Sequence, residues 1–179
     1  MESLKAHLLV ASPGLYDPNF RKTVVLVAEH NEEGALGLVL NHPAEVTVHE
    51  TVPPLTEVTQ PEDLLFIGGP VQPTDVVILA DLGDPERLDL PVMGGIGILS
   101  GVLEDDALAD ARAIRVFAGY SGWGPGQLER ELEEDSWLTL SALPSDAFAD
   151  PEQLWADVVR RLGREHAFLA TMPIDPGLN

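Results

Sequence analysis

The sequence predicts an α+β fold. Short strand-like runs outnumber helix-like runs, and the two kinds do not alternate regularly along the chain. Regular alternation would indicate a doubly wound parallel sheet, so its absence favours α+β. The 16 glycines and 15 prolines are spread over the whole chain, without a linker segment or a repeat period. We therefore predict a single compact domain over residues 1–179, built from many short elements.

Strands are predicted where short apolar or β-branched runs end at turn residues. The expected strands are residues 6–11, 23–28, 35–40, 64–67, 75–80, 96–99 and 114–118. Residues 29–34 form a polar connection with Gly34 near its end, which indicates a β-hairpin with a longer loop. Residues 47–55 are ambiguous, because Pro53 and Pro54 exclude a long helix but allow a short one before them.

Three helices are predicted. A modest helix covers residues 104–111, with acidic residues in its first turn that suit the helix dipole. A second begins at Pro125, after a cap at Gly124. The third begins at Pro151, with Asp150 as its N-cap. The apolar stripe of this third helix consists of Leu154, Trp155, Val158, Val159 and Leu162.

Composition excludes several classes of protein. The chain has 10 Lys and Arg against 30 Asp and Glu, a net charge of −20, which argues against a surface that binds nucleic acid. It has no cysteine, which excludes disulfides and thiolate metal sites. No apolar run approaches the roughly 20 residues of a membrane span, and the first residues do not read as an export signal. We expect a cytoplasmic protein that contacts no membrane.

The chain lacks the residue spacing that familiar catalytic and nucleotide-binding motifs require. The glycine-rich stretch 94–101 has Ser100 where a dinucleotide fingerprint needs its third glycine, so it predicts a strand or turn. Trp123 stands two residues after Ser121, at the position where the nucleophile elbow of a hydrolase needs glycine. No phosphate-binding P-loop is present. We predict no cofactor.

The five histidines do not form a metal-binding motif. They are His7, His30, His42, His49 and His166, and none is paired at the spacing of HxH or HExxH. An alternative is that His30 with Glu32 or Glu33 binds a divalent ion through the hairpin loop. An ordinary polar turn explains the same residues, and we predict no metal site.

Residues 119–129 are the most unusual stretch of the chain. Glycines surround Tyr120 and Trp123 just before a predicted helix. Such a loop lets backbone approach a ligand closely, and the two aromatic rings can form the walls of a pocket. The alternative is a packed connection in which Trp123 covers the core.

Several blocks together resemble the YqgE/AlgH family of bacterial proteins, which are often labelled transcriptional regulators. The matching blocks are residues 7–13, 17–20, 23–25, 29–41, 43, 68–71, 119–129, 131, 137 and 172–179. The resemblance implies an α+β domain with a small β-barrel or a bent mixed sheet flanked by helices. The family offers no established catalytic residue, and its members more often have Ala where Ser121 stands.

The leading hypothesis is a non-enzymatic binding or regulatory protein that acts through a small ligand or a protein partner. Direct DNA contact is disfavoured, since no helix-turn-helix signal and no basic face is present. The alternative is a hydrolase with His30 as general base and Glu29 or Glu131 near it. The candidate ligand-binding residues are Glu29, His30, Asn31, Asn41, Tyr120, Ser121, Trp123, Gln127 and Glu131.

Overall fold

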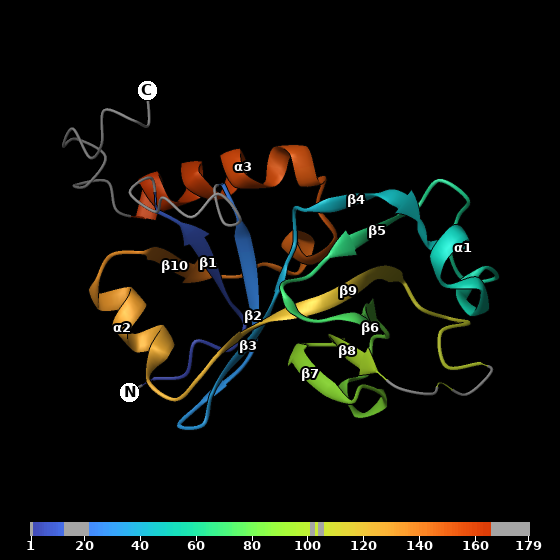
Figure 1. Ribbon diagram of the computed structural model, residues 1–179, viewed down its shortest axis with the longest axis horizontal. Coiled ribbons are helices and arrows are strands. Elements are labelled where there is room, and N and C mark those ends of the chain that lie inside the picture. Colours follow the sequence, from blue (N-terminus) through green and yellow to red (C-terminus); the bar gives the residue numbers. More distant parts are fainter. Residues whose placement is uncertain (1, 13–21, 101–102, 104–105, 166–179) are drawn as a thin grey trace.

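A computed structural model of the chain describes residues 2–12, 22–100, 103 and 106–165, and shows a curled sheet with helices along its margins (Figure 1). The strands are β1 (His7–Ala11), β2 (Val24–Asn31), β3 (Gly34–Val39), β4 (Pro43–Thr47), β5 (Leu64–Ile67), β6 (Val71–Asp81), β7 (Leu90–Met93), β8 (Ile96–Ser100), β9 (Ala113–Trp123) and β10 (Trp137–Ser141). The α-helices are α1 (Val48–Thr51), α2 (Gln127–Glu133) and α3 (Pro151–Glu165), and short 3₁₀ helices cover Pro53–Leu55, Pro85–Arg87 and Pro144–Phe148.

The ten described strands form one sheet. Eight of them follow the order β10-β1-β2-β3-β9-β6-β8-β7, in which all neighbours are antiparallel. Strand β4 pairs with β5, and β5 joins the sheet through a parallel ladder with β9. The α+β class and the bent mixed sheet are confirmed.

The small β-barrel considered as one form of the fold is wrong, because the sheet does not close. Strand β7 comes near β2, but in the described part of the chain it forms a ladder only with β8. Its Pro91 has no N–H group to donate to a further strand, as is typical of an edge. Strand β10 at the other end pairs only with β1.

Both faces of the sheet are covered, which explains why β1 and β2 read as continuous apolar runs. Leu8 belongs to a buried cluster that includes Leu154 of α3. Leu9, on the opposite face, packs in a second cluster with Leu128 of α2. A third cluster lies between β6, β8 and β9 and includes Val48 of α1. Helices α2 and α3 thus cover different faces of the same strands (Figure 1).

All seven predicted strands are confirmed, and so is the third helix with its Asp150 cap, whose Oδ1 accepts the N–H of Glu152 at 2.9 Å. The 29–34 hairpin is also confirmed, although its turn is shorter than expected: Asn31 pairs with Gly34, which has a φ of +132°. Helix α2 begins two residues later than predicted, at Gln127.

Two predictions of secondary structure are wrong. The helix predicted over 104–111 is absent from its described part, since residues 106–110 form turns. Residues 119–123 are not a loop but the end of strand β9. The sequence also gave no prediction for β4, β7 or β10. Residues 13–21, His166 and the block 172–179 lie outside the described residues.

Candidate functional site

Three of the candidate residues hold helix α2 on the sheet. Oε1 of Glu131 accepts the indole N–H groups of Trp123 at 3.0 Å and of Trp137 at 2.8 Å. Its Oε2 accepts the side-chain amide of Gln127 at 2.9 Å, and Oε1 of Gln127 accepts the N–H of Gly124 at 3.0 Å. The two indole rings are buried and meet edge to face. We call Trp123, Gln127, Glu131 and Trp137 the α2 anchor.

Trp123 therefore covers the core instead of lining an open pocket. This outcome matches the second of the two interpretations of residues 119–129. The polar groups of the α2 anchor bond to one another, which is the usual condition of buried polar groups in a stable protein.

His30 lies in β2 with both ring nitrogens engaged. Its Nδ1 accepts the N–H of Leu4 at 2.9 Å, and its Nε2 lies 2.8 Å from Oε1 of Glu129. Since Nδ1 is the acceptor, Nε2 carries the proton and donates to the carboxylate. The side chain is buried, and neither Glu29 nor Glu131 is its partner. A general base needs a free nitrogen that faces substrate, so this arrangement does not support the hydrolase alternative.

An open cleft of about 630 Å³ lies beside His30. It is lined by Glu2, Ser3, His30, Asn31, Glu32, Glu33 and Glu129, and we call it the acidic cleft. Within the described residues, no group of three or more His, Asp or Glu side chains is placed to hold a metal ion. The divalent-ion alternative at His30, Glu32 and Glu33 thus gains no support from the geometry. Asn31 accepts the N–H of Glu33 within the turn.

The remaining candidates lie apart from one another. Asn41 is at the opposite end of the β2–β3 hairpin from His30, where Oδ1 accepts the N–H of Val24 at 3.0 Å and Nδ2 donates to the carbonyl of Lys22 at 2.8 Å. Ser121 is buried and donates to the carbonyl of Gly68 at 3.1 Å. Glu29 lies in β2 opposite Leu36. The structure does not bring the nine candidate residues into one site.

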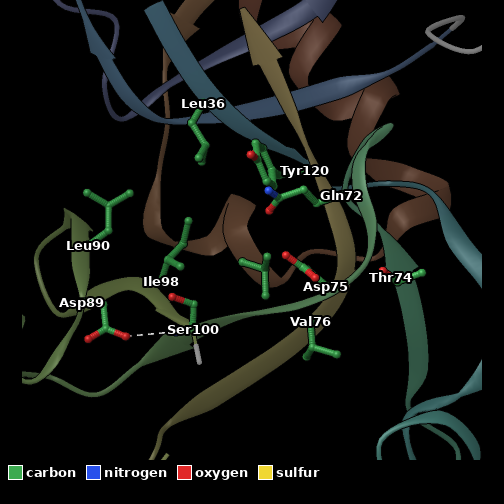
Figure 2. Close-up of a pocket in the computed structure, with 11 residues that line it drawn as sticks. Leu36, Gln72, Thr74, Asp75, Val76, Asp89, Leu90, Ile98, Ser100 and Tyr120 are labelled. Atoms are coloured by element: carbon green, nitrogen blue, oxygen red, sulfur yellow. Dashed lines mark hydrogen bonds between the residues drawn. The ribbon is translucent and has the colours of Figure 1, made fainter. Parts of the chain in front are cut away.

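Tyr120 lines a different and larger cavity, which Figure 2 shows. Its volume is about 750 Å³, and we call it the bulge pocket. The lining residues come from β3, β6, β7, β8 and β9 and the turn before β7, and they are Leu36, Gln72, Thr74, Asp75, Val76, Val77, Asp89, Leu90, Ile98, Ser100 and Tyr120.

A wide irregularity in strand β6 forms one side of this pocket. Val71 pairs with Tyr120 of β9 and Val76 pairs with Ala118, so five steps along β6 oppose two steps along β9. Residues 72–75 thus stand opposite the single residue Gly119, and they supply three of the lining side chains. Strand bulges redirect side chains and are frequent next to functional sites.

Glycines make the bulge possible. Gly119 has a φ of +71°, and a Cβ there would lie 2.6 Å from the carbonyl oxygen of Gly69. Gly69 has a φ of +154°, and a Cβ there would lie 2.3 Å from the carbonyl of Tyr120. The two backbones thus approach more closely than any side chain allows. Gln72, which is not a glycine, also has a positive φ of 47°.

The lining of the bulge pocket combines an apolar floor with polar groups at its rim. In Figure 2, Ile98 lies between Asp75 of β6 and Asp89, Leu90 stands beside Asp89, and Leu36 lies nearer to Tyr120. Oδ2 of Asp89 accepts the N–H of Ser100 at 3.0 Å. Sites that bind small molecules also combine apolar lining with polar groups that orient the ligand.

Gln72, Asp75 and Asp89 line the bulge pocket but are not among the nine residues that the sequence pattern indicates. A usable signal was present, because Pro73 interrupts a polar run that leads directly into the apolar strand 76–80. Proline inside a strand marks an edge or a bulge. The partner side of the pocket, with Asp89, has no comparable local signal.

These features define an α+β protein built on one curled, mostly antiparallel sheet. The model of a family described as AlgH-like (DUF179) matches residues 8–167. The chain is 42% identical over 187 residues to a UPF0301 protein of Streptomyces coelicolor, covering 100% of this chain and 97% of the relative. It is 41% identical over 179 residues to one of Mycolicibacterium smegmatis, covering 96% and 89%.

Two solved structures have the same fold. The crystal structure of protein DIP2367 from Corynebacterium diphtheriae matches with a TM-score of 0.79 and 29% identity, covering 90% of this chain and 87% of that one. The solution structure of the AlgH protein from Pseudomonas aeruginosa matches with a TM-score of 0.72 and 32% identity, covering 95% and 94%. The chain belongs to the AlgH-like family, which confirms the resemblance given by the sequence. None of these names states an activity.

The helices of the described residues include none that is long and apolar enough to cross a membrane.

Proposed function

We propose that this chain is a non-enzymatic binding or regulatory protein that holds a small ligand, or a segment of a protein partner, in the bulge pocket. The observation that carries the proposal is the β6 irregularity, which adds residues 72–75 to the rim of an open cavity with an apolar floor. Tight glycine contacts maintain this costly backbone arrangement. Packing alone does not require Gln72 and Asp75 to line a cavity, whereas bulges at functional sites often redirect side chains in this way.

The charge distribution supports action without direct DNA contact. Three of the few arginines are already paired with carboxylates: Arg87 with Asp110, Arg160 with Asp157 and Arg161 with Asp146. These ion pairs engage arginine side chains that would otherwise be available to bind phosphate. Together with the net charge of −20, they leave little to attract a nucleic acid.

The test is a titration of the ¹⁵N-labelled full chain, followed by ¹H–¹⁵N correlation spectra, with a panel of metabolites, nucleotides and a short DNA duplex. We expect at least one small molecule to shift the amide signals of residues 72–77, Ser100 and Tyr120. The duplex should shift none at physiological salt.

Two matched variants separate the bulge pocket from the rest of the surface. Val76 lines the pocket and is 36% exposed, and Val46 lies outside it on β4 and is 37% exposed. Val76→Phe should abolish the shifts by filling the pocket, and Val46→Phe should leave them unchanged. A panel that never shifts these amides, or shifts that survive Val76→Phe, would overturn the proposal.

A further inference from the structure

We infer that the ligand of the bulge pocket is an organic cation, an ammonium or guanidinium group on an apolar stem. This inference rests on the proposed function and narrows it to one class of ligand. It follows from the charges of the pocket, from the state of its carboxylates and from the shape of its floor.

The charged side chains of the described lining are Asp75 and Asp89, and none is basic. They lie on opposite sides of the cavity (Figure 2). Neither has an ion-pair partner in the part of the chain that the structure describes. Two carboxylates that face one cavity attract a cation and repel an anion.

Asp89 is positioned to bind a cationic ligand. Its Oδ2 accepts the backbone N–H of Ser100 at 3.0 Å, which fixes the position of the carboxylate, and its Oδ1 has no hydrogen-bond partner among the described residues. Hydrogen bonds between a charged donor and a carboxylate are among the strongest in proteins. A ligand with an ammonium or guanidinium group would supply the donors that this oxygen and Asp75 accept.

The apolar lining of the bulge pocket determines which uncharged part of the ligand can bind there. Leu36, Leu90 and Ile98 give the cavity an apolar surface, with Ile98 between the two carboxylates, and the ring of Tyr120 adds an aromatic wall (Figure 2). An aromatic face also attracts cations directly. A purely apolar ligand would bury the carboxylates without compensation, which is unfavourable. A cation on an apolar stem satisfies both parts of the pocket.

The acidic cleft beside His30 provides an internal comparison. It carries more carboxylates, from Glu2, Glu32, Glu33 and Glu129, but the described residues of its lining include no aliphatic or aromatic side chain. Charge alone would favour the acidic cleft, whereas charge combined with an apolar floor favours the bulge pocket. The two sites therefore give different results in one experiment.

The probes are benzylamine, benzyl alcohol and benzoate, which share a ring and differ in charge. Each is titrated into the ¹⁵N-labelled full chain at constant ionic strength, and dissociation constants come from the amide shifts. Benzylamine should shift residues 72–77, Ser100 and Tyr120, with benzyl alcohol binding at least about tenfold more weakly. Benzoate should leave these signals unchanged.

Two double variants with equal charge loss locate the effect. Asp75→Asn with Asp89→Asn should weaken benzylamine binding by about tenfold or more and leave benzyl alcohol unchanged. Asparagine still offers an acceptor for the Ser100 N–H, so the fold is preserved. Glu32→Gln with Glu33→Gln, in the acidic cleft, should have no effect on the benzylamine shifts.

Each other outcome overturns the inference. Equal binding of benzyl alcohol or benzoate in the bulge pocket would refute the cation preference while supporting the pocket as a binding site. Benzylamine shifts that disappear only in the glutamate variant would assign cation binding to the acidic cleft. If no probe shifts the pocket amides, the cation inference fails, and the wider panel decides whether the proposed function fails with it.

Discussion

Glu131 on α2 accepts the indole N–H of Trp123 on β9 at 3.0 Å, and this bond fastens the helix to the end of a long central strand. The same oxygen accepts the indole of Trp137 at the start of β10. One carboxylate thus joins a central strand, an edge strand and the helix between them. The residues that looked most like a ligand site in the sequence are, in the structure, the means by which this corner of the fold is held together.

Replacement of Glu131 by Ala should destabilise the protein. The buried N–H of Trp123 would lose its acceptor, and an unsatisfied buried donor costs about 1–3 kcal/mol in free energy of unfolding. Urea denaturation followed by tryptophan fluorescence measures the loss. Glu133→Ala, on the exposed side of the same helix, is the control and should cost less than about 0.5 kcal/mol. Equal losses in the two variants would contradict a bonding role for Glu131.

His30 should control the order of the N-terminal segment. Its Nδ1 accepts the N–H of Leu4, and Ser3 Oγ donates to its carbonyl oxygen. In His30→Ala the amide of Leu4 loses its acceptor, so its hydrogen exchange should accelerate by about tenfold or more. His49→Ala, which alters a histidine of α1 far along the chain, should leave that exchange rate unchanged. An unaltered rate in His30→Ala would show that the segment is held by other contacts.

The sequence predicted most of the sheet because its central strands are defined locally. Residues 24–28, for example, are apolar throughout, as expected for a strand covered on both faces. Strands β4 and β10 have weak local patterns because each is only five residues long and lies at an edge of the sheet. The end of β9 was read as a loop, since Gly119 and Gly122 weaken a strand pattern. Only the close approach of Gly119 to Gly69 explains why a glycine is needed at position 119 of this strand.

The candidate site was less predictable than the fold. Tyr120 is the one candidate residue that lines the bulge pocket. Asp75 and Asp89 lie on opposite sides of this pocket only because β6 and the hairpin of β7 and β8 pair in one sheet. Long-range pairing of this kind leaves no pattern in the neighbouring residues. His30 and Trp123 attracted attention by type, but their roles depend on partners distant in sequence, such as Leu4 for His30.

Alanine substitutions at Gly119 and Gly94 should distinguish the cost of backbone strain from the cost of a steric collision. Both have positive φ, +71° and +55°, but a Cβ at Gly94 would meet nothing within 4 Å, whereas one at Gly119 would lie 2.6 Å from the oxygen of Gly69. Gly94→Ala should therefore cost about 1–2 kcal/mol of unfolding free energy, from strain alone. Gly119→Ala should cost about 3 kcal/mol or more, because the collision adds to the strain. Urea denaturation of both variants checks this, and similar costs would refute the close crossing beneath the bulge pocket.

The stability of the protein should depend on the protonation of His42. Burial lowers the pKa of His42 below its ordinary value of 6.5, and its Nε2 lies 3.2 Å from Oγ1 of Thr23. Between the lowered pKa and about 6.5 the unfolded chain binds the proton more readily than the folded one, so the free energy of unfolding falls as the pH drops through that window.

Replacement of His42 by Gln should remove this contribution. The variant retains a polar side chain but has no group that titrates near neutral pH, so its free energy of unfolding should fall less than that of the native chain between about pH 7.5 and about pH 5.5. Urea denaturation at both pH values measures the two slopes, and the comparison of slopes cancels any constant cost of the substitution. Identical slopes would show that His42 titrates alike in the folded and unfolded chains, contrary to its burial beside Thr23.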